Sequence, residues 1–289
     1  MRDYEKPYIG QGVLSMATAN FDSWFRSPRT ILMLLFVVAI CFLQMCGYAM
    51  TLQETGYTMH LMETLFYEFN FGCNMPMTTV LFLITVSELP RRIPYQHYSL
   101  IRSSRTRWIA AQMLYCIMMV VMMITLLLIC ISVMSLPLIS PGTGWSDAER
   151  IARGEIDPYD ALVDELFLTT FSPFSATIIA IVPVFLFWLT MVFIILLFGI
   201  WGMPVFGVMT YAFLLVANVT ILFEAFPFQL ILPIHFATLQ NIISGHNGNE
   251  LVVFSNTVAV YSFILILLVF IMVTSIRHTE LVFYSDNKL

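Results

Sequence analysis

The longest uncharged stretch of the sequence runs from Leu166 to Phe223 and contains no Asp, Glu, Lys or Arg. A helix needs about 20 apolar residues to cross the hydrocarbon core of a bilayer, so this stretch is too long for one crossing. The turn-forming sequence GIWGMP, residues 199–204, divides it into two apolar runs. The stretch therefore predicts two consecutive membrane-spanning helices, at about residues 175–198 and 205–223.

Composition extends this interpretation to the whole chain. The 289 residues are 59% hydrophobic and 11% charged, with a mean hydropathy of +0.85. Soluble domains are nearer to half apolar and a quarter charged, so this composition indicates a bilayer protein. The fold class that we expect is an all-α integral membrane protein, with residues 1–289 forming a single transmembrane domain of six helices. The other four spans are expected at about residues 31–50, 69–87, 108–136 and 257–276.

The distribution of basic residues predicts the orientation, because cytoplasmic connections carry the excess of Lys and Arg. Arg150 and Arg153 lie in the connection between the third and fourth expected spans. The other eleven of the thirteen basic residues (13 − 2) lie at the termini or between the second and third spans. We therefore expect both termini and segment 88–107 in the cytoplasm, loop 137–170 outside, and a multi-pass protein of the cell membrane.

Segment 88–107 is the most basic part of the chain. Pro90 and Pro94 favour a defined helix start after them, because proline suits a first helical turn and disfavours a helix before it. From Tyr95 onward, apolar and basic side chains separate at helical spacing, which is typical of an amphipathic helix lying across the membrane face. Two interpretations remain open for the five arginines, which either orient the chain alone or also dock another protein. They are Arg91, Arg92, Arg102, Arg105 and Arg107.

Three further features outside the apolar runs are candidates for function. Glu68, at the start of the second span, is either a functional intramembrane carboxylate or a residue of the membrane interface. His60 and Glu63, at i and i+3, have no further metal ligands beside them, so a solvated pair on the outer face is the preferred interpretation. Segment 224–250 is too apolar for an open loop and contains Pro227 and Pro233, which predicts a re-entrant segment before the last helix.

Several chemistries have no motif in the sequence. No G-x-x-x-x-G-K-[ST] phosphate-binding loop occurs, and the sequence PGTG at 141–144 lacks the lysine. The five cysteines are scattered singly, so neither a disulfide framework nor a zinc site is indicated. We therefore expect no enzyme activity, no metal and no cofactor in this chain itself.

The layout of six spans, cytoplasmic termini and a proline-bounded basic helix resembles the membrane permease of an ABC-2 type transporter. The sequence PYQHYSLIRSSRTRWIAAQML is similar to the loop that leads into the third helix of bacterial members. The sequence FDSWFR, residues 21–26, is similar to the family's N-terminal interfacial helix, although an ordinary aromatic belt explains it equally well.

The resemblance implies that segment 88–107 forms a coupling helix docked on a separate ATPase subunit, which holds ATP and Mg. Glu88 and Arg91 would lie at the inner mouth, and the chain would pair with itself or with a second permease. The cargo would be amphipathic or hydrophobic, such as a peptide, lipid or drug, and would be exported. The implied docking residues are Tyr95, Tyr98, Arg102 and Arg105.

An alternative class is a membrane-embedded enzyme or immunity protein. That class needs reactive groups that converge at one depth of the membrane. The candidates are instead expected on both faces, which favours the transporter; they are His60, Glu68, Glu88 and His235. The expected partners are the lipid bilayer, an ATPase subunit and a second permease, and no nucleic acid is expected.

Overall fold

The protein is described here by a computed structural model that covers residues 12–55, 59–70, 74–90, 104–142, 144–146, 170–222 and 250–278. Within these ranges every regular element is a helix, apart from an isolated bridge between Met59 and Ile139. The all-α class is thus confirmed for the described part. The helices are α1 (Val13–Phe25), α2 (Pro28–Thr55), α3 (Leu61–Asn70), α4 (Asn74–Val86), α6 (Arg105–Ser135), α9 (Pro173–Ile200), α10 (Pro204–Leu222) and α12 (Glu250–His278).

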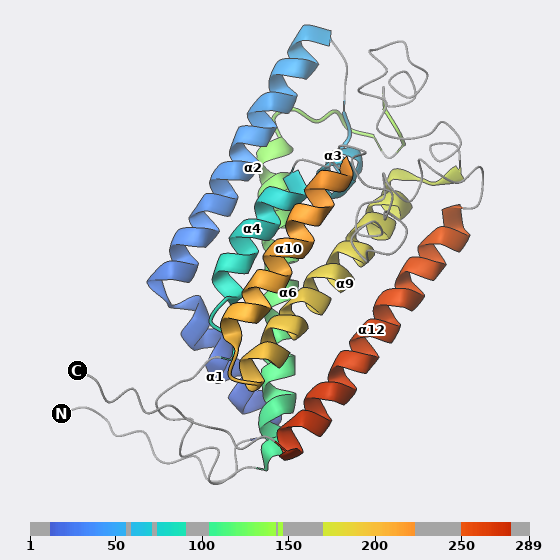
Figure 1. Cartoon of the computed structure of the whole chain (residues 1–289). Helices are drawn as coiled ribbons and strands as arrows, with labels where there is room; N and C mark the ends of the chain where they lie inside the picture. Colours follow the sequence, from blue (N-terminus) through green and yellow to red (C-terminus); the bar gives the residue numbers. More distant parts are fainter. Residues whose placement is uncertain are drawn as a thin grey trace, which may run out of the picture.

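The long helices lie side by side as a bundle, with α1 at one end and α3 at the other (Figure 1). We call these the α1 end and the α3 end. α9 occupies the centre, because it packs against α3, α6, α10 and α12. Burial agrees with this position, since 61% of the most apolar stretch of α9 is buried, compared with 22% for α2 and α12.

Four helices in the described part are long and apolar enough to cross a membrane. They lie in α2, α6, α9 and α12 and coincide with four of the six expected spans. The structure therefore agrees with a multi-pass membrane protein.

The described residues of the second expected span, 69–87, belong to α3 and α4, apart from Ser87. α3 ends at Asn70 and α4 begins at Asn74, with residues 71–73 outside the described part. α4 has 13 residues, so it is about 20 Å long, whereas a hydrocarbon core is about 30 Å thick. α10 follows the bounds expected for the fifth span.

The break between α9 and α10 lies where the glycines and the proline predict it. Gly202 has a φ of 77°, which a residue without a Cβ adopts freely, and its N–H donates to Gly199 O at 3.2 Å. Met203 N donates to Phe198 O at 2.9 Å, and α10 begins at Pro204. These bonds satisfy the last carbonyls of α9, so the chain reverses direction in a tight turn.

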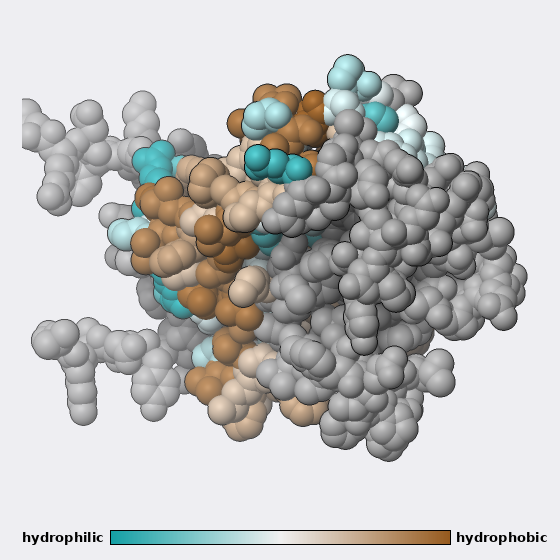
Figure 2. All heavy atoms as spheres, turned by 90° about the horizontal axis from the view of Figure 1, so that it is seen from above, coloured by the Kyte–Doolittle hydropathy of each residue, from teal (hydrophilic) through white to brown (hydrophobic). Residues whose placement is uncertain are grey.

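Large apolar side chains cover much of the outer surface of the described helices. Figure 2, which views the molecule of Figure 1 from above, shows hydrophobic residues on the flank that grey atoms leave uncovered. A soluble protein rarely exposes so many, whereas a bilayer accepts them. Examples are Leu35, Phe42 and Leu43 on α2, Phe206, Met209 and Phe213 on α10, and Phe263, Ile266 and Phe270 on α12.

Candidate functional site: a polar junction at the α1 end

The chain turns sharply between α1 and α2 because Ser27 caps the start of α2. Thr30 N donates to Ser27 Oγ at 3.2 Å, and Ser27 Oγ donates to Thr30 Oγ1 at 2.8 Å. Pro28 follows as the first helical residue, where its missing N–H costs nothing. This corner places Arg29 in the first turn of α2, at the α1 end of the bundle.

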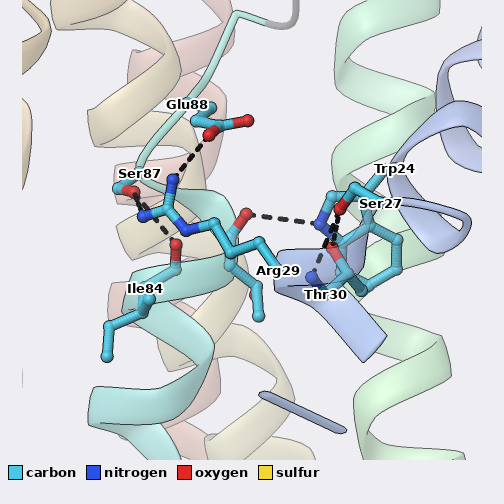
Figure 3. Close-up of polar contacts among 8 residues, drawn as sticks. Trp24, Ser27, Arg29, Thr30, Ile84, Ser87 and Glu88 are labelled. Carbon is cyan, nitrogen blue, oxygen red and sulfur yellow. Dashed lines mark hydrogen bonds and ion pairs between the residues drawn. The ribbon is translucent and has the colours of Figure 1, made fainter. Parts of the chain in front are cut away.

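Arg29 joins the start of α2 to the end of α4 (Figure 3). Its Nη1 lies 2.5 Å from Glu88 Oε1, and its Nη2 donates to Ser87 Oγ at 2.8 Å. Ser87 Oγ in turn donates to Ile84 O at 3.0 Å, so the hydroxyl satisfies a carbonyl in the last turn of α4. The arginine also lies at the negative end of the α4 dipole, which favours a cation there.

Trp24 fixes α1 to the same end of α4. Its Nε1 donates to Thr85 O at 3.2 Å, and the side chain is 1% exposed. Phe21 packs beside it in a tilted arrangement, with ring centroids 5.6 Å apart. A buried indole that satisfies a helix carbonyl contributes both packing and a hydrogen bond. α1 therefore packs into the bundle through Trp24 instead of lying against it by apolar contact alone.

The chain leaves α4 through a close contact with α9. Leu89 N donates to Val86 O at 3.1 Å, and both Leu89 and Pro90 are buried. A Cβ on Gly199 would overlap Pro90 Cδ, so the absence of a side chain on Gly199 makes room for the proline ring. Residues 88–90 are thus held by α2 and α9 where the basic segment begins.

The far end of the basic segment is a capped helix start. Ser104 Oγ accepts a hydrogen bond from Arg107 N at 3.4 Å, which caps α6. Arg105 and Arg107 are exposed in the first turn, which contains no acidic residue. The positive end of the helix dipole adds to their charge. The start of α6 therefore carries a positive charge suited to an acidic protein surface or to anionic headgroups.

No protein family, curated protein or solved structure matches this chain. The assignment of a function therefore depends on the residues and on their arrangement.

The predicted site residues are placed as follows. Glu88 is exposed and pairs with Arg29, and Arg105 is exposed at the start of α6. Glu68 is buried in α3, at 4% exposure, so it lies inside the bundle. Arg91, Tyr95, Tyr98 and Arg102 lie outside the described residues, as do residues 147–169 of the expected loop and residues 224–249 of the expected re-entrant segment.

The expectation that His60 and Glu63 form a solvated pair is wrong. Glu63 is 1% exposed, and its Oε2 accepts hydrogen bonds from His60 N at 3.2 Å, Ser146 N at 3.3 Å and Ser146 Oγ at 2.5 Å. Burial raises the pKa of Glu63 above its ordinary range, and the bonds from Ser146 and His60 act in the opposite direction. The carboxylate caps α3 and at the same time holds the connection that follows α6.

These contacts belong to a set of interactions at the α3 end that we call the α3 clasp, formed by His60, Glu63, Trp145 and Ser146. His60 Nδ1 lies 2.7 Å from Gly144 O, and Trp145 Nε1 donates to Phe171 O at 2.7 Å. The clasp thus joins α3, the end of the α6 connection and the approach to α9. Among the described residues, no three His, Cys, Asp or Glu side chains lie close enough to hold a metal ion.

Sequence reasoning missed both the Arg29–Glu88 pair and the α3 clasp. Arg29 and Glu88 are 59 residues apart in the chain, and Glu63 and Ser146 are 83 apart. Only one local signal pointed to either: a glutamate three residues after the helix cap, which is half of a capping box. In this chain His60 occupies the cap position that Ser or Thr usually occupies.

Proposed function

We propose that this chain is the membrane-spanning permease subunit of an ABC-2 type transporter, and that segment 88–107 docks a separate ATP-hydrolysing subunit. The observation that carries the proposal is the junction at the α1 end. Residues 88–90 are held by Arg29 and Gly199, and Ser104 caps α6 on the other side of the segment. Force applied to such a segment is transmitted to α2, α4, α6 and α9 together.

Charge supports the same proposal. The described arginines that precede α2 or begin α2 and α6 all lie at the α1 end (Figure 1). Arg26 pairs with Asp22 at 2.9 Å and Arg29 pairs with Glu88. Arg105 and Arg107 are exposed in the first turn of α6. Among charged residues, arginine is the one enriched at protein interfaces.

The proposal includes six crossings, with residues 69–87 as the second and α10 as the fifth. It places both termini and segment 88–107 in the cytoplasm, following the excess of Lys and Arg. The permease pairs with a second copy or a sister permease, and its mostly apolar helices suit an amphipathic or hydrophobic cargo. The positions of the acidic residues favour this over a membrane-embedded enzyme, since Glu63 lies at the α3 end and Glu88 at the α1 end.

The test is to replace Tyr98 and Arg102 together with alanine. This removes an aromatic and a cation from the proposed docking surface, and a strong interface residue contributes about 2 kcal/mol or more to binding. Arg91, Arg92 and Arg107 remain, so insertion and orientation should be unchanged. The measurement is the amount of ATPase that copurifies with the double variant at equal membrane abundance.

A matched control removes Phe25 and Arg26, which are also an exposed aromatic and an exposed cation at the α1 end. We expect the control to retain the ATPase and the Tyr98/Arg102 variant to lose it. Equal copurification of the ATPase with both variants and the unaltered chain would show that the arginines only orient the protein.

A further inference from the structure

Buried polar side chains in the described part of the bundle mostly have hydrogen-bond partners. Trp188 Nε1 donates to Thr79 Oγ1 at 3.0 Å, and Thr177 Oγ1 donates to Pro173 O at 2.8 Å. Such pairing is expected, because a bilayer core offers no water to a group that lacks a partner.

Two side chains on α6 depart from this rule. Gln112 is 0% exposed, and within the described protein neither its amide nitrogen nor its amide oxygen has a hydrogen-bond partner. The same is true of Nε1 of Trp108, whose side chain is 4% exposed. The two residues are at i and i+4 in one helix, so their side chains lie one above the other on the same face.

The other buried side-chain atoms without a partner in the described part are the hydroxyls of Thr190 and Tyr211. A threonine hydroxyl in a helix can rotate onto the carbonyl of the preceding turn, as Thr125 Oγ1 does with Val121 O at 2.8 Å. One rotation of this kind cannot satisfy both ends of the Gln112 amide. The α6 pair therefore has the largest unmet hydrogen-bonding capacity, and leaving it unmet in an apolar interior would be costly.

We propose that Trp108 and Gln112 form a binding site for a small uncharged ligand that carries both a donor and an acceptor, with water as its simplest occupant. The Trp108 indole donates a hydrogen bond, and the Gln112 amide both donates and accepts one. A ligand that pairs with both side chains therefore needs an acceptor and a donor. Both residues are uncharged, so they offer an ion no compensating charge.

The position of the site connects it with the junction. At about 1.5 Å per residue, Gln112 lies about 10 Å along α6 from Arg105. The site is therefore inside the bundle and near its α1 end, where α6 begins. If the chain is a transporter as proposed, an uncharged polar group of the cargo would contact Trp108 and Gln112. The binding site itself does not depend on the proposed function.

The experiment measures whether water and small uncharged molecules reach the site. A chain without its native cysteines receives one cysteine by Gln112→Cys, and its reaction rate with N-ethylmaleimide is followed in membranes by mass spectrometry. Maleimides react with the thiolate, which forms only where water is present. The matched control is Ala111→Cys, at nearly the same depth and in a residue 1% exposed.

We expect Q112C to react at least about tenfold faster than A111C, because an apolar surrounding suppresses the thiolate. Equal rates would overturn the proposal and show that the amide is simply unpaired in a dry interior. The charge preference is tested with a cationic thiol reagent, a trimethylammonium methanethiosulfonate. For each reagent, the reaction rate of Q112C is divided by the rate of Thr106→Cys, which is an exposed position. Equal normalised rates for the cationic reagent and N-ethylmaleimide would overturn the restriction to uncharged ligands.

Two native cysteines give a second measurement if Q112C does not fold. Cys116 is one turn beyond Gln112 on the same face and is 0% exposed, whereas Cys130 lies further along α6 and is 8% exposed. Packing alone predicts that Cys130 reacts faster. The proposed site predicts the reverse, and a faster Cys130 in chains that retain a single native cysteine would overturn it.

Discussion

At the scale of single residues, the clearest chemistry is that of Glu63. The bundle buries this carboxylate almost completely, yet supplies three donor groups from two residues. Removing a carboxylate from water is costly, and donors that converge on one oxygen recover part of that cost. Glu63 therefore stabilises the α3 clasp through the hydrogen bonds that its Oε2 accepts.

Replacing Glu63 with alanine should destabilise the protein. His60 N, Ser146 N and Ser146 Oγ would lose their shared acceptor, and a buried group without a partner costs about 1–3 kcal/mol. Glu63→Gln keeps an acceptor of the same shape, so it should retain most of the stability. Melting of the purified chain in detergent measures both variants, and equal losses for alanine and glutamine would show that the hydrogen bonds do not matter.

The same carboxylate predicts a pH dependence. Burial raises its folded pKa above the ordinary value of 4.5, so the folded state binds the proton more tightly than the unfolded state does. The stability that this shift contributes is complete below the ordinary value and is lost as the pH rises through the raised pKa. The unaltered chain should thus lose stability relative to Glu63→Gln as the pH rises from 4.5, measured as melting temperature against pH. Parallel pH profiles would contradict the prediction.

At the scale of elements, the contact between Gly199 near the end of α9 and Pro90, four residues beyond α4, leaves no room for an added side chain. An alanine usually stabilises a helix relative to glycine by about 1 kcal/mol. At Gly199, however, the added Cβ would overlap Pro90, and the neighbouring backbone leaves little room to move. The last turn of α9 therefore sets where segment 88–107 can begin.

Gly199→Ala should consequently destabilise the protein by about 1–3 kcal/mol, which is typical of an overpacked contact. Gly47→Ala on α2 is the matched control, because a Cβ there meets no atom within 4 Å. We expect the control to be neutral or slightly stabilising. Melting curves of the two variants decide the matter, and a stabilised G199A would mean that Pro90 does not pack against α9.

At the scale of the whole molecule, the testable property is which end of the bundle faces which side of the membrane. Thr106 is exposed at the α1 end, and Gly144 is exposed at the α3 end in open space. In chains without native cysteines, a membrane-impermeant maleimide should label Gly144→Cys in intact cells and Thr106→Cys only after permeabilisation. Labelling in the opposite order would reverse the proposed orientation.

The sequence by itself determined the properties that depend on local composition. The apolar runs identified four helices of spanning length, because the number of consecutive apolar residues needed to cross a bilayer can be counted along the sequence. The sequence also predicted the break between α9 and α10, because Gly202 and Pro204 change the backbone conformation at their own positions.

The tertiary structure alone decided which side chains meet. Apolar helices in a bilayer have nearly uniform faces, so their sequence says little about which face turns toward which neighbour. Arg29 reaches Glu88 and Glu63 reaches Ser146 only because separate helices pack side by side. Gln112 looks like an ordinary polar residue in the sequence, and only the packing of the bundle leaves it buried without a hydrogen-bond partner in the described part of the protein.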